Sequence, residues 1–334
     1  MKRISACSML VFSLFLVASS VAAAPSAPGY HVIKTISVGG DGGWDYLTFD
    51  AVSRRLYIAR SNRVMVFDVD KEALVGEVPK TAGVHGVALV PKLDRGFASC
   101  GGDSTVCVFD LKSLAEVARI DVGKRPDAIL YDPATNQVFT FNASGSATAI
   151  DPEKGKVVGT IELGGKPEFP VSDEKGQIFV NLEDKSEIAA LDANKLTVLH
   201  RWPVAPGEEP SGMSIDRARG RVFATCGNQQ MIALDTATGK IVGTAPIGKG
   251  TDACAFDLDA NLAFSSNRDG TLTVVREDPD GKLEVAETVA TQAGARTMAL
   301  DPKTHNVLLV TAKPKAGERR AFEPGSFVIL VVGK

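Results

Sequence analysis

The chain has 334 residues, with 32 glycines, 17 prolines and an aromatic content of 6%. That length is sufficient for a large buried core, and the many glycines and prolines favour a structure rich in turns over one of long helices. The formal net charge of −3 argues against a nucleic-acid partner, because such proteins usually present a basic surface.

The first 23 residues have the pattern of a signal peptide. Lys2 and Arg3 precede an apolar run over 9–17, and residues 21–23 are of the small type that signal peptidase prefers. A membrane-spanning helix needs about 20 apolar residues, whereas this run is shorter and is followed by serines. We therefore predict cleavage after Ala23, no membrane span, and a mature chain, 24–334, that is periplasmic or secreted.

An internal repeat of about 42 residues occupies the mature chain. Segments such as 46–68, 128–151 and 212–235 each show an apolar strand that ends in Asp, a polar turn, a second strand around an aromatic residue, and a third alternating strand. The Asp that ends the first strand recurs at Asp50, Asp132, Asp173, Asp216, Asp257 and Asp301, and Val90 takes its place in the second repeat. In the repeats before the last one, a fourth strand follows the third strand. Seven units of four strands predict an all-β, seven-bladed β-propeller with antiparallel blades.

The last repeat lacks its fourth strand. Its three strands are expected near 297–301, 305–311 and 326–332, and the sequence stops at Lys334. Residues 31–38 have the pattern of a closing strand but stand at the front of the mature chain. Because an open seam would leave a row of backbone groups unpaired, we predict that 31–38 forms the outer strand of the last blade and closes the single domain.

Several repeats follow the frame Tyr-Val-Thr-Asn, polar turn, Val-x-Val-(Ile/Phe)-Asp. Partial matches are "LYIARSNRVMVFD" (56–68), "IFVNLEDKSEIAALD" (178–192) and "LAFSSNRDGTLTVV" (262–275). On these motifs the chain resembles the YncE-like, YVTN-repeat family of bacterial β-propellers over essentially all of its mature length. The resemblance implies an exported seven-bladed scaffold without a shared catalytic set, so no catalytic residue is predicted.

The repeated aspartates are interpreted as turn residues. Each ends a strand before a turn such as "DPATN" or "DTATG". A short carboxylate at such a position accepts hydrogen bonds from the backbone N–H groups that follow it. This interpretation excludes them as a catalytic or metal-binding set.

A second set of positions is predicted to ring the mouth of the central channel. Five residues before each repeat Asp, or before Val90, the innermost strand should begin beside the channel. These positions are Asp45, His85, Asp127, Glu168, Ser211, Asp252 and Arg296, and Asn142 and Asn267 are expected to add donors from neighbouring turns.

Crowded carboxylates repel one another unless a cation neutralises them. We call the channel mouth formed by these residues the funnel, and the face of the ring on which it opens the top face. The funnel is predicted to bind a small polar ligand, a divalent cation or a protein segment. The alternative is a hydrated channel mouth without a ligand.

The functional prediction is a monomeric binding module rather than an enzyme, with no cofactor motif evident except for the divalent cation considered above. The alternative is a metal-assisted hydrolase or lactonase that acts at the funnel and uses the same carboxylates and His85. Neither a haem-attachment nor a thioredoxin-like motif occurs.

The mature chain retains four cysteines: Cys100, Cys107, Cys226 and Cys254. An oxidising compartment permits disulfides, and the hairpin turn between Cys100 and Cys107 could bring these two opposite each other, which the sequence does not decide. Four buried free thiols are nevertheless the favoured prediction.

The turn between the second and third strands is exceptionally long in the last repeat, where it covers 312–325. It carries Lys313, Lys315, Arg319 and Arg320. Long loops on compact folds often have functions. The loop is predicted to be either a lid or docking segment for an acidic partner, or a solvated insertion.

Overall fold

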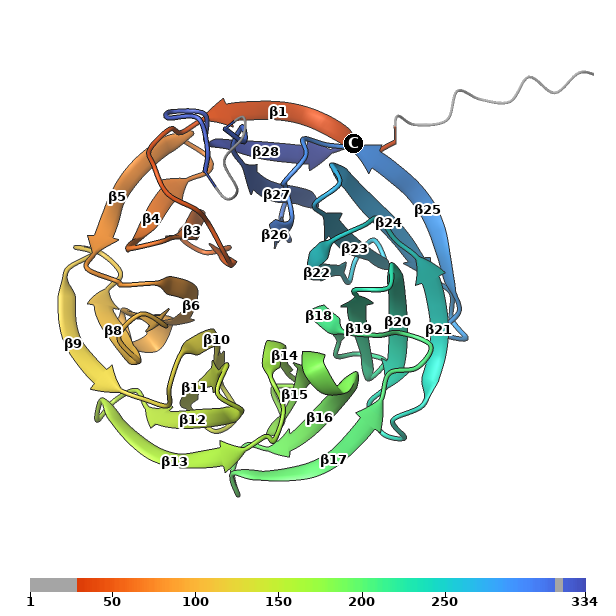
Figure 1. Cartoon of the computed structure of the whole chain (residues 1–334), viewed down its shortest axis with the longest axis horizontal. Coiled ribbons are helices and arrows are strands. Elements are labelled where there is room, and N and C mark those ends of the chain that lie inside the picture. The colour runs from red at the N-terminus through yellow and green to blue at the C-terminus, as the bar shows by residue number, and fades with distance from the viewer. Residues whose placement is uncertain (1–28, 316–320) are drawn as a thin grey trace, which may run out of the picture.

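Seven four-stranded antiparallel sheets surround a central opening, which confirms the predicted seven-bladed β-propeller (Figure 1). The computed structural model describes residues 29–315 and 321–334. The predicted signal peptide lies outside the described residues. Within the described part of the chain, no helix has the length and apolar character needed to cross a membrane.

The first four blades follow the chain order from the centre of the ring to its rim. Their strands are β2 (Leu47–Asp50), β3 (Arg55–Arg60), β4 (Arg63–Asp68) and β5 (Ala73–Pro79); β6 (Val84–Val90), β7 (Arg95–Cys100), β8 (Thr105–Asp110) and β9 (Glu116–Asp121); β10 (Pro126–Asp132), β11 (Gln137–Asn142), β12 (Ser146–Asp151) and β13 (Lys156–Glu162); and β14 (Pro167–Ser172), β15 (Gln177–Leu182), β16 (Glu187–Asp192) and β17 (Thr197–Pro203). Two short 3₁₀ turns, η1 (Pro91–Leu93) and η2 (Glu183–Lys185), connect strands within blades 2 and 4.

The remaining three blades continue this pattern, except that the last one takes its outer strand from the start of the described chain. Their strands are β18 (Pro210–Asp216), β19 (Arg221–Cys226), β20 (Gln230–Asp235) and β21 (Ile241–Pro246); β22 (Thr251–Asp257), β23 (Leu262–Asn267), β24 (Thr271–Glu277) and β25 (Leu283–Ala290); and β26 (Thr297–Asp301), β27 (Asn306–Thr311), β28 (Val328–Gly333) and β1 (His31–Ser37).

Pairing of β1 with β28 closes the ring. The two strands run antiparallel from the pair His31 and Gly333 to the pair Ser37 and Val328. The backbone N–H groups just after β1 extend this pairing by donating to the carbonyl of Phe327. The predicted closure by the leading strand is therefore confirmed, and Figure 1 shows β1 on the outer edge of the blade that contains β28.

The hydrophobic core is divided among the seven interfaces between neighbouring blades. Each of seven buried clusters combines side chains from two adjacent blades, including the pair formed by blades 7 and 1. The aromatic residue predicted in the second strand anchors six blades and is at most 1% exposed; it is Tyr57, Phe97, Phe139, Phe179, Phe223 or Phe264. Each such ring stabilises the fold by roughly 1.5–3 kcal/mol through burial.

The repeated aspartates act as turn residues, as predicted. Oδ1 of Asp50 accepts the backbone N–H groups of Val52 and Ser53, and Oδ1 of Asp257 accepts two N–H groups in the same way. The aspartates that end the third strands, such as Asp192, repeat this geometry. Their lone pairs are therefore used locally in the turns.

Every outer strand contains a β-bulge, which the sequence analysis did not predict. In each blade one residue of the outer strand has no partner on the third strand; these residues are Ile33, Val75, Val117, Val158, Leu199, Val242 and Ala286. A bulge increases the local twist and interrupts the straight edge that another strand could pair with. Several exposed aliphatic side chains on the rim, among them Ile33, Val117 and Val158, thus belong to bulges rather than to the core.

The four cysteines of the described chain are buried free thiols, as favoured from the sequence. Cys107 lies opposite Ala98 and Cys100 opposite Thr105, so the hairpin does not place the two cysteines directly opposite each other. Burial raises the pKa of Cys107 to about 12. A thiol held in its protonated form is a poor nucleophile.

Candidate functional site

The seven predicted channel-mouth residues lie together. Asp45, His85, Asp127, Glu168, Ser211, Asp252 and Arg296 all line one funnel-shaped cavity of about 530 Å³. They come from the beginnings of the innermost strands of all seven blades or from the residues just before them. The repeat spacing therefore predicted their convergence correctly.

A break in strand pairing at these positions accompanies their exposure to the channel. The register between first and second strands shifts between Val84 and Val87, which leaves His85 outside the regular ladder. The same shift surrounds Asp127 and Glu168 in the next two blades. Such irregularities release a side chain from the alternation of a regular strand and re-aim it.

Polar side chains from the preceding blade fix the backbone at several ring positions. The Ser99 hydroxyl donates to the carbonyl of Asp127 at 2.5 Å, and the Asn181 amide donates to that of Ser211 at 2.7 Å. The Ser266 hydroxyl donates to the carbonyl of Arg296 at 2.5 Å. These residues were not predicted from the sequence, although each is a polar residue at the next-to-last position of the second strand of its blade.

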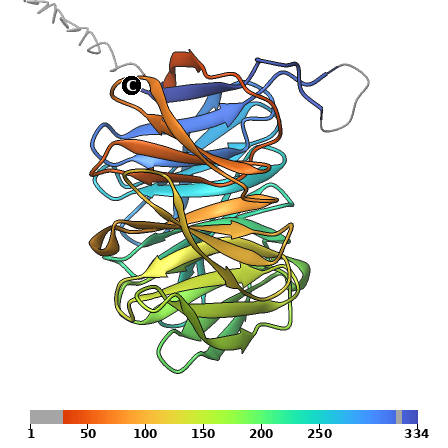
Figure 2. The same cartoon turned by 90° about the vertical axis from the view of Figure 1, so that its left-hand side faces the viewer.

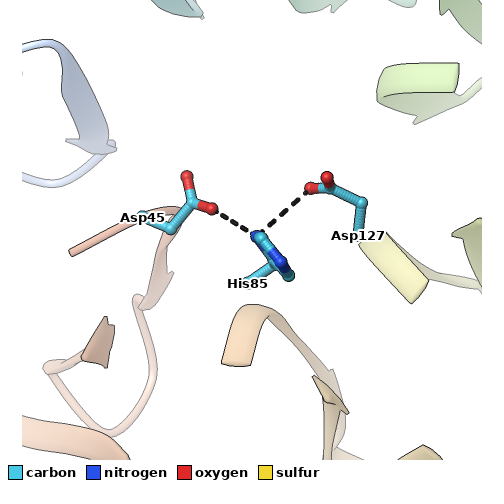
Figure 3. A group of neighbouring side chains, drawn as sticks. All are labelled: Asp45, His85 and Asp127. Carbon is cyan, nitrogen blue, oxygen red and sulfur yellow. Dashed lines mark hydrogen bonds and ion pairs between the residues drawn. The ribbon is translucent and has the colours of Figure 1, made fainter. Parts of the chain in front are cut away.

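Asp45, His85 and Asp127 form a close group of possible metal ligands in the funnel (Figure 3). Nδ1 of His85 lies 2.6 Å from Oδ2 of Asp45 and 3.6 Å from Oδ1 of Asp127. Burial alone would lower the pKa of His85, but the hydrogen bond to Asp45 and the two carboxylate charges raise it overall. The proton on Nδ1 is therefore donated to Asp45, and Asp127 lies within ion-pair distance of the same nitrogen.

The same three side chains could hold a divalent cation in place of that proton. Their ligand atoms all lie within 4.8 Å of one another. Two carboxylate oxygens and one imidazole nitrogen on one side leave room for further ligands from the funnel, a donor set that suits Mn²⁺, Zn²⁺ or Ca²⁺.

Glu168 occupies a second acidic position deeper in the wall. Burial, followed by the charge of Asp127, raises the pKa of Glu168 to about 7 despite Lys166, whose Nζ lies 2.7 Å from Oε1. The Tyr46 hydroxyl lies 3.5 Å from Oε2 of the same carboxylate. Burial also raises the pKa of Asp127, against the opposing effect of His85.

Arg296 neutralises the opposite side of the funnel. Its guanidinium forms a close ion pair with Asp252, lies 3.8 Å from Asp45, and donates to the carbonyl of Trp44 at 3.0 Å. Ser211 completes this side, with its hydroxyl 3.4 Å from a carboxylate oxygen of Asp252. Arg296 therefore supplies an internal counter-charge to the carboxylates on this side of the funnel.

The funnel as a whole carries more acidic than basic groups. Its lining contains six carboxylates, three permanent cations and His85. Sequence reasoning missed Tyr46, Lys166, Glu183, Glu209 and Arg268. Tyr46, Lys166 and Glu209 are within two residues of ring positions. Glu183 and Arg268 lie in the turns between second and third strands, where no repeated pattern marks them.

Asn142 and Asn267 are not funnel donors, which corrects the sequence-based expectation. Both side chains are fully buried. The Asn142 amide donates to the hydroxyls of Ser146 and Thr148, and Asn267 makes the equivalent bonds inside its own blade. Their donors serve the hairpin between second and third strands because the side chains turn inward there.

The long insertion of the last blade forms a hairpin on the funnel side. Pro314 bridges Phe322, and the N–H of Glu323 donates to the carbonyl of Lys313 at 2.8 Å. Phe322 packs against Trp44, with ring centroids 4.7 Å apart. Figure 2 shows the hairpin extending from one face of the ring. Residues 316–320, with the predicted basic residues Arg319 and Arg320, lie outside the described residues.

The fold and the family model that matches the sequence point to the same class of protein. Seven blades around a charged channel mouth define a β-propeller protein. The family model described as "Outer membrane protein assembly factor BamB" matches residues 102–275 and, in an overlapping match, 145–321. The chain belongs to this family.

A curated relative and solved structures also contain repeats or folds of this class. A WD repeat-containing protein of Saccharomyces cerevisiae is 26% identical over 215 residues, which covers 61% of this chain and 32% of the yeast protein. The chain therefore spans about a third of that relative's length.

Two solved structures share the fold at low sequence identity. A chain of the hydrazine synthase of Kuenenia stuttgartiensis has a TM-score of 0.72 at 15% identity, covering 81% of this chain and 94% of that one. A chain of a mitotic checkpoint complex has a TM-score of 0.76 at 12% identity, covering 98% and 99%. At these identities the likeness shows the fold alone.

Proposed function

We propose that the protein is a binding module whose funnel takes up a positively charged group. The observation that carries the proposal is the excess of six carboxylates over three permanent cations in one cavity. A ligand that brings a positive charge relieves the repulsion among these carboxylates, whereas an anion would add to it. An ammonium or guanidinium group of a polar ligand or protein segment fits this requirement, as does a divalent cation.

The preferred position for the charge is the group of Asp45, His85 and Asp127. A metal cation there replaces the proton on Nδ1, the ring nitrogen that lies 2.6 Å from Oδ2 of Asp45. Uptake should therefore release a proton, as is usual when imidazole becomes a ligand. The reaction is expected to strengthen as the pH rises, because His85 must be neutral to coordinate a metal.

Calorimetric titration with Mn²⁺, Zn²⁺, Ca²⁺ and spermidine tests this function. We expect one-site binding for at least one of the four, and an affinity about tenfold or more weaker in Asp127→Asn. Asp121→Asn is the matched control, because Asp121 is exposed on the outer strand β9. The absence of binding for all four probes would contradict the proposal.

Export and membership of the YncE-like, YVTN-repeat group are part of the same proposal. Support comes from the signal-peptide pattern of 1–23, from the partial repeat matches such as 56–68, and from the outer-membrane factor named in the family description. Expression of the full chain in a Gram-negative host should give a periplasmic protein that begins at Ala24. A cytoplasmic product that retains residues 1–23 would contradict export.

A protein partner is favoured for the module in its compartment. The family description names an assembly factor, and Phe322 of the last blade's insertion lines a cavity that shares Arg268 and Arg296 with the funnel. A partner segment with a Lys or Arg side chain would place its charge among the carboxylates and its backbone against the hairpin.

A metal-assisted hydrolase is the second candidate function. The possible metal ligands share the cavity with Glu168, whose pKa of about 7 suits proton transfer at neutral pH. Hydrolysis of simple lactones or aryl esters that disappears on chelation and in Glu168→Gln would support it. Metal uptake without such turnover would leave the binding module as the function.

A further inference from the structure

A second cavity lies beside the funnel and has a different chemical character. Its volume is about 360 Å³, and it is lined by Gly43, Trp44, Arg268, Gly294, Arg296 and Phe322. Arg268 and Arg296 also line the funnel, so the two cavities adjoin along these guanidinium groups. Asp45, His85 and Asp127 do not line the second cavity, which makes it separable from the proposed cation position.

Aromatic rings supply one wall of this side cavity. Trp44 packs on Phe322 with centroids 4.7 Å apart and on Phe327 with centroids 5.6 Å apart. Phe322 belongs to the long hairpin of the last blade, so this insertion completes the wall. A planar ring can pack against such side chains in offset or edge-to-face geometry.

The indole of Trp44 carries an unused donor. Trp44 is only 8% exposed, and its Nε1–H has no hydrogen-bond partner among residues 29–315 and 321–334. A buried donor without an acceptor is costly, and buried indole N–H groups usually find a partner. Nε1 has almost no accessible surface, so a molecule in the side cavity meets the indole ring of Trp44 rather than this donor.

The positive charge of the side cavity is not fully used either. Arg296 is occupied by Asp252, Asp45 and the carbonyl of Trp44. Arg268 is exposed on the turn between β23 and β24, and its guanidinium forms no ion pair or hydrogen bond within the described chain. The lining includes no described carboxylate, in contrast to the funnel.

We propose that this side cavity binds an aromatic carboxylate. The ring lies against Trp44 and Phe322, and the carboxylate accepts from the guanidinium of Arg268. The ligand can be a small aryl-alkanoic acid or the C-terminal residue of a peptide that ends in Phe, Tyr or Trp, because both present the same two groups. A cavity of this size lined by rings and a few polar groups is typical of small-molecule sites.

Tryptophan fluorescence reports on this cavity directly. The chain has two tryptophans, so Trp202→Phe leaves Trp44 as the sole emitter. We expect 3-phenylpropanoate to change the Trp44 emission in a saturable way and to give one-site heat by calorimetry. The uncharged analogue 3-phenylpropanamide should bind at least about tenfold more weakly, because it lacks the charge-assisted hydrogen bond.

Substitutions separate the site from general surface effects. Arg268→Gln should weaken 3-phenylpropanoate binding about tenfold, and Phe322→Ala should also weaken it. Arg276→Gln is the matched control, since Arg276 is exposed on β24 of the same blade but at the opposite end of the strand. Because Arg268 is on the surface, its replacement should leave the thermal unfolding curve unchanged.

Peptides distinguish the two sources of the ligand. Tighter binding of a peptide with a free C-terminal Phe than of 3-phenylpropanoate, lost on amidation of its C-terminus, assigns the site to chain ends. Equal affinities assign it to free aryl acids. Equal binding of 3-phenylpropanoate and its amide, no binding up to millimolar probe, or an Arg268→Gln protein with full affinity would overturn the proposal.

Discussion

Glu168 shows how burial sets charge in the funnel wall. Its carboxylate lies 2.7 Å from the ammonium of Lys166, an arrangement that by itself favours the ionised form. Burial and the charge of Asp127 outweigh the ion pair and raise the pKa to about 7. The folded protein therefore binds a proton here over a pH range in which the unfolded chain does not.

The pH dependence of stability should reveal this proton. Because the folded pKa is raised, the stabilisation by the proton is complete below the unfolded value near 4.5 and is lost as the pH rises through about 7. Glu168→Gln, which mimics the protonated acid, should match the wild type near pH 4.5 and exceed its stability at pH 8 by at most about 3 kcal/mol.

Urea unfolding of both proteins at pH 4.5, 6, 7 and 8 measures this difference. Glu183→Gln serves as the control, because it removes the other carboxylate bonded to Lys166. A constant difference between Glu168→Gln and wild type across the range would contradict the raised pKa.

Asn142 and Asn267 mark the limit of position-based prediction at the residue scale. Their place in the sequence correctly puts them where the second strand meets its turn. The direction of a side chain there depends on which acceptors the folded blade offers, and the Ser and Thr hydroxyls of the next strand draw both amides inward. A pattern of residue types contains no such information.

At the scale of elements, the leading strand β1 is the part of the chain on which the last blade depends. Val32 and Ile36 pack against the buried clusters at the two sides of that blade. Their burial contributes about 3 kcal/mol or more. Without β1, the backbone groups on the outer edge of β28 would face solvent and could pair with another molecule.

Removal of residues 29–38 should therefore destabilise the protein by at least about 3 kcal/mol and promote aggregation. A synthetic peptide of residues 29–38, added in trans, should restore the melting temperature, whereas a scrambled peptide of the same composition should not. Equal melting temperatures of the shortened and full proteins would show that β1 is dispensable. Differential scanning fluorimetry measures all three.

The apolar pattern of the sequence predicted the positions of the outer strands but not the β-bulges within them. Period-2 alternation located the strands, and the outer strands lie where expected. The extra residue in each of them, such as Val158, interrupts pairing with the third strand because the sheet must twist strongly at the rim. Its exposed aliphatic side chain looks like a core residue in the sequence.

At the scale of the whole molecule, the seam between blades 7 and 1 is fastened by a buried ion pair. The two terminal guanidinium nitrogens of Arg54, Nη1 and Nη2, each donate to the carboxylate of Asp301 at 2.6 Å. The two residues are 247 positions apart, and the Asp301 side chain is 4% exposed. This contact forms only when the ring is closed.

Arg54→Met should cost about 3 kcal/mol, because it leaves a buried carboxylate without its partner. Combining it with Asp301→Asn should cost less than the sum of the two single changes. Arg63→Met is the control, since its ion pair with Glu77 is within one blade and more exposed. The interpretation fails if Arg54→Met proves no more destabilising than Arg63→Met in chemical denaturation.

Four features could be predicted from the amino-acid sequence alone. They are the number of blades, the closing strand, the turn role of the aspartates and the seven positions that meet at the channel mouth. These follow from a repeat of about 42 residues, because equal units stack at equal angles around an axis. Three further features became visible only in the folded structure: the pairing of His85 with two aspartates, the raised pKa of Glu168, and the side cavity at Trp44 and Phe322. Those features depend on burial and on distances between residues of different blades, which no local pattern encodes.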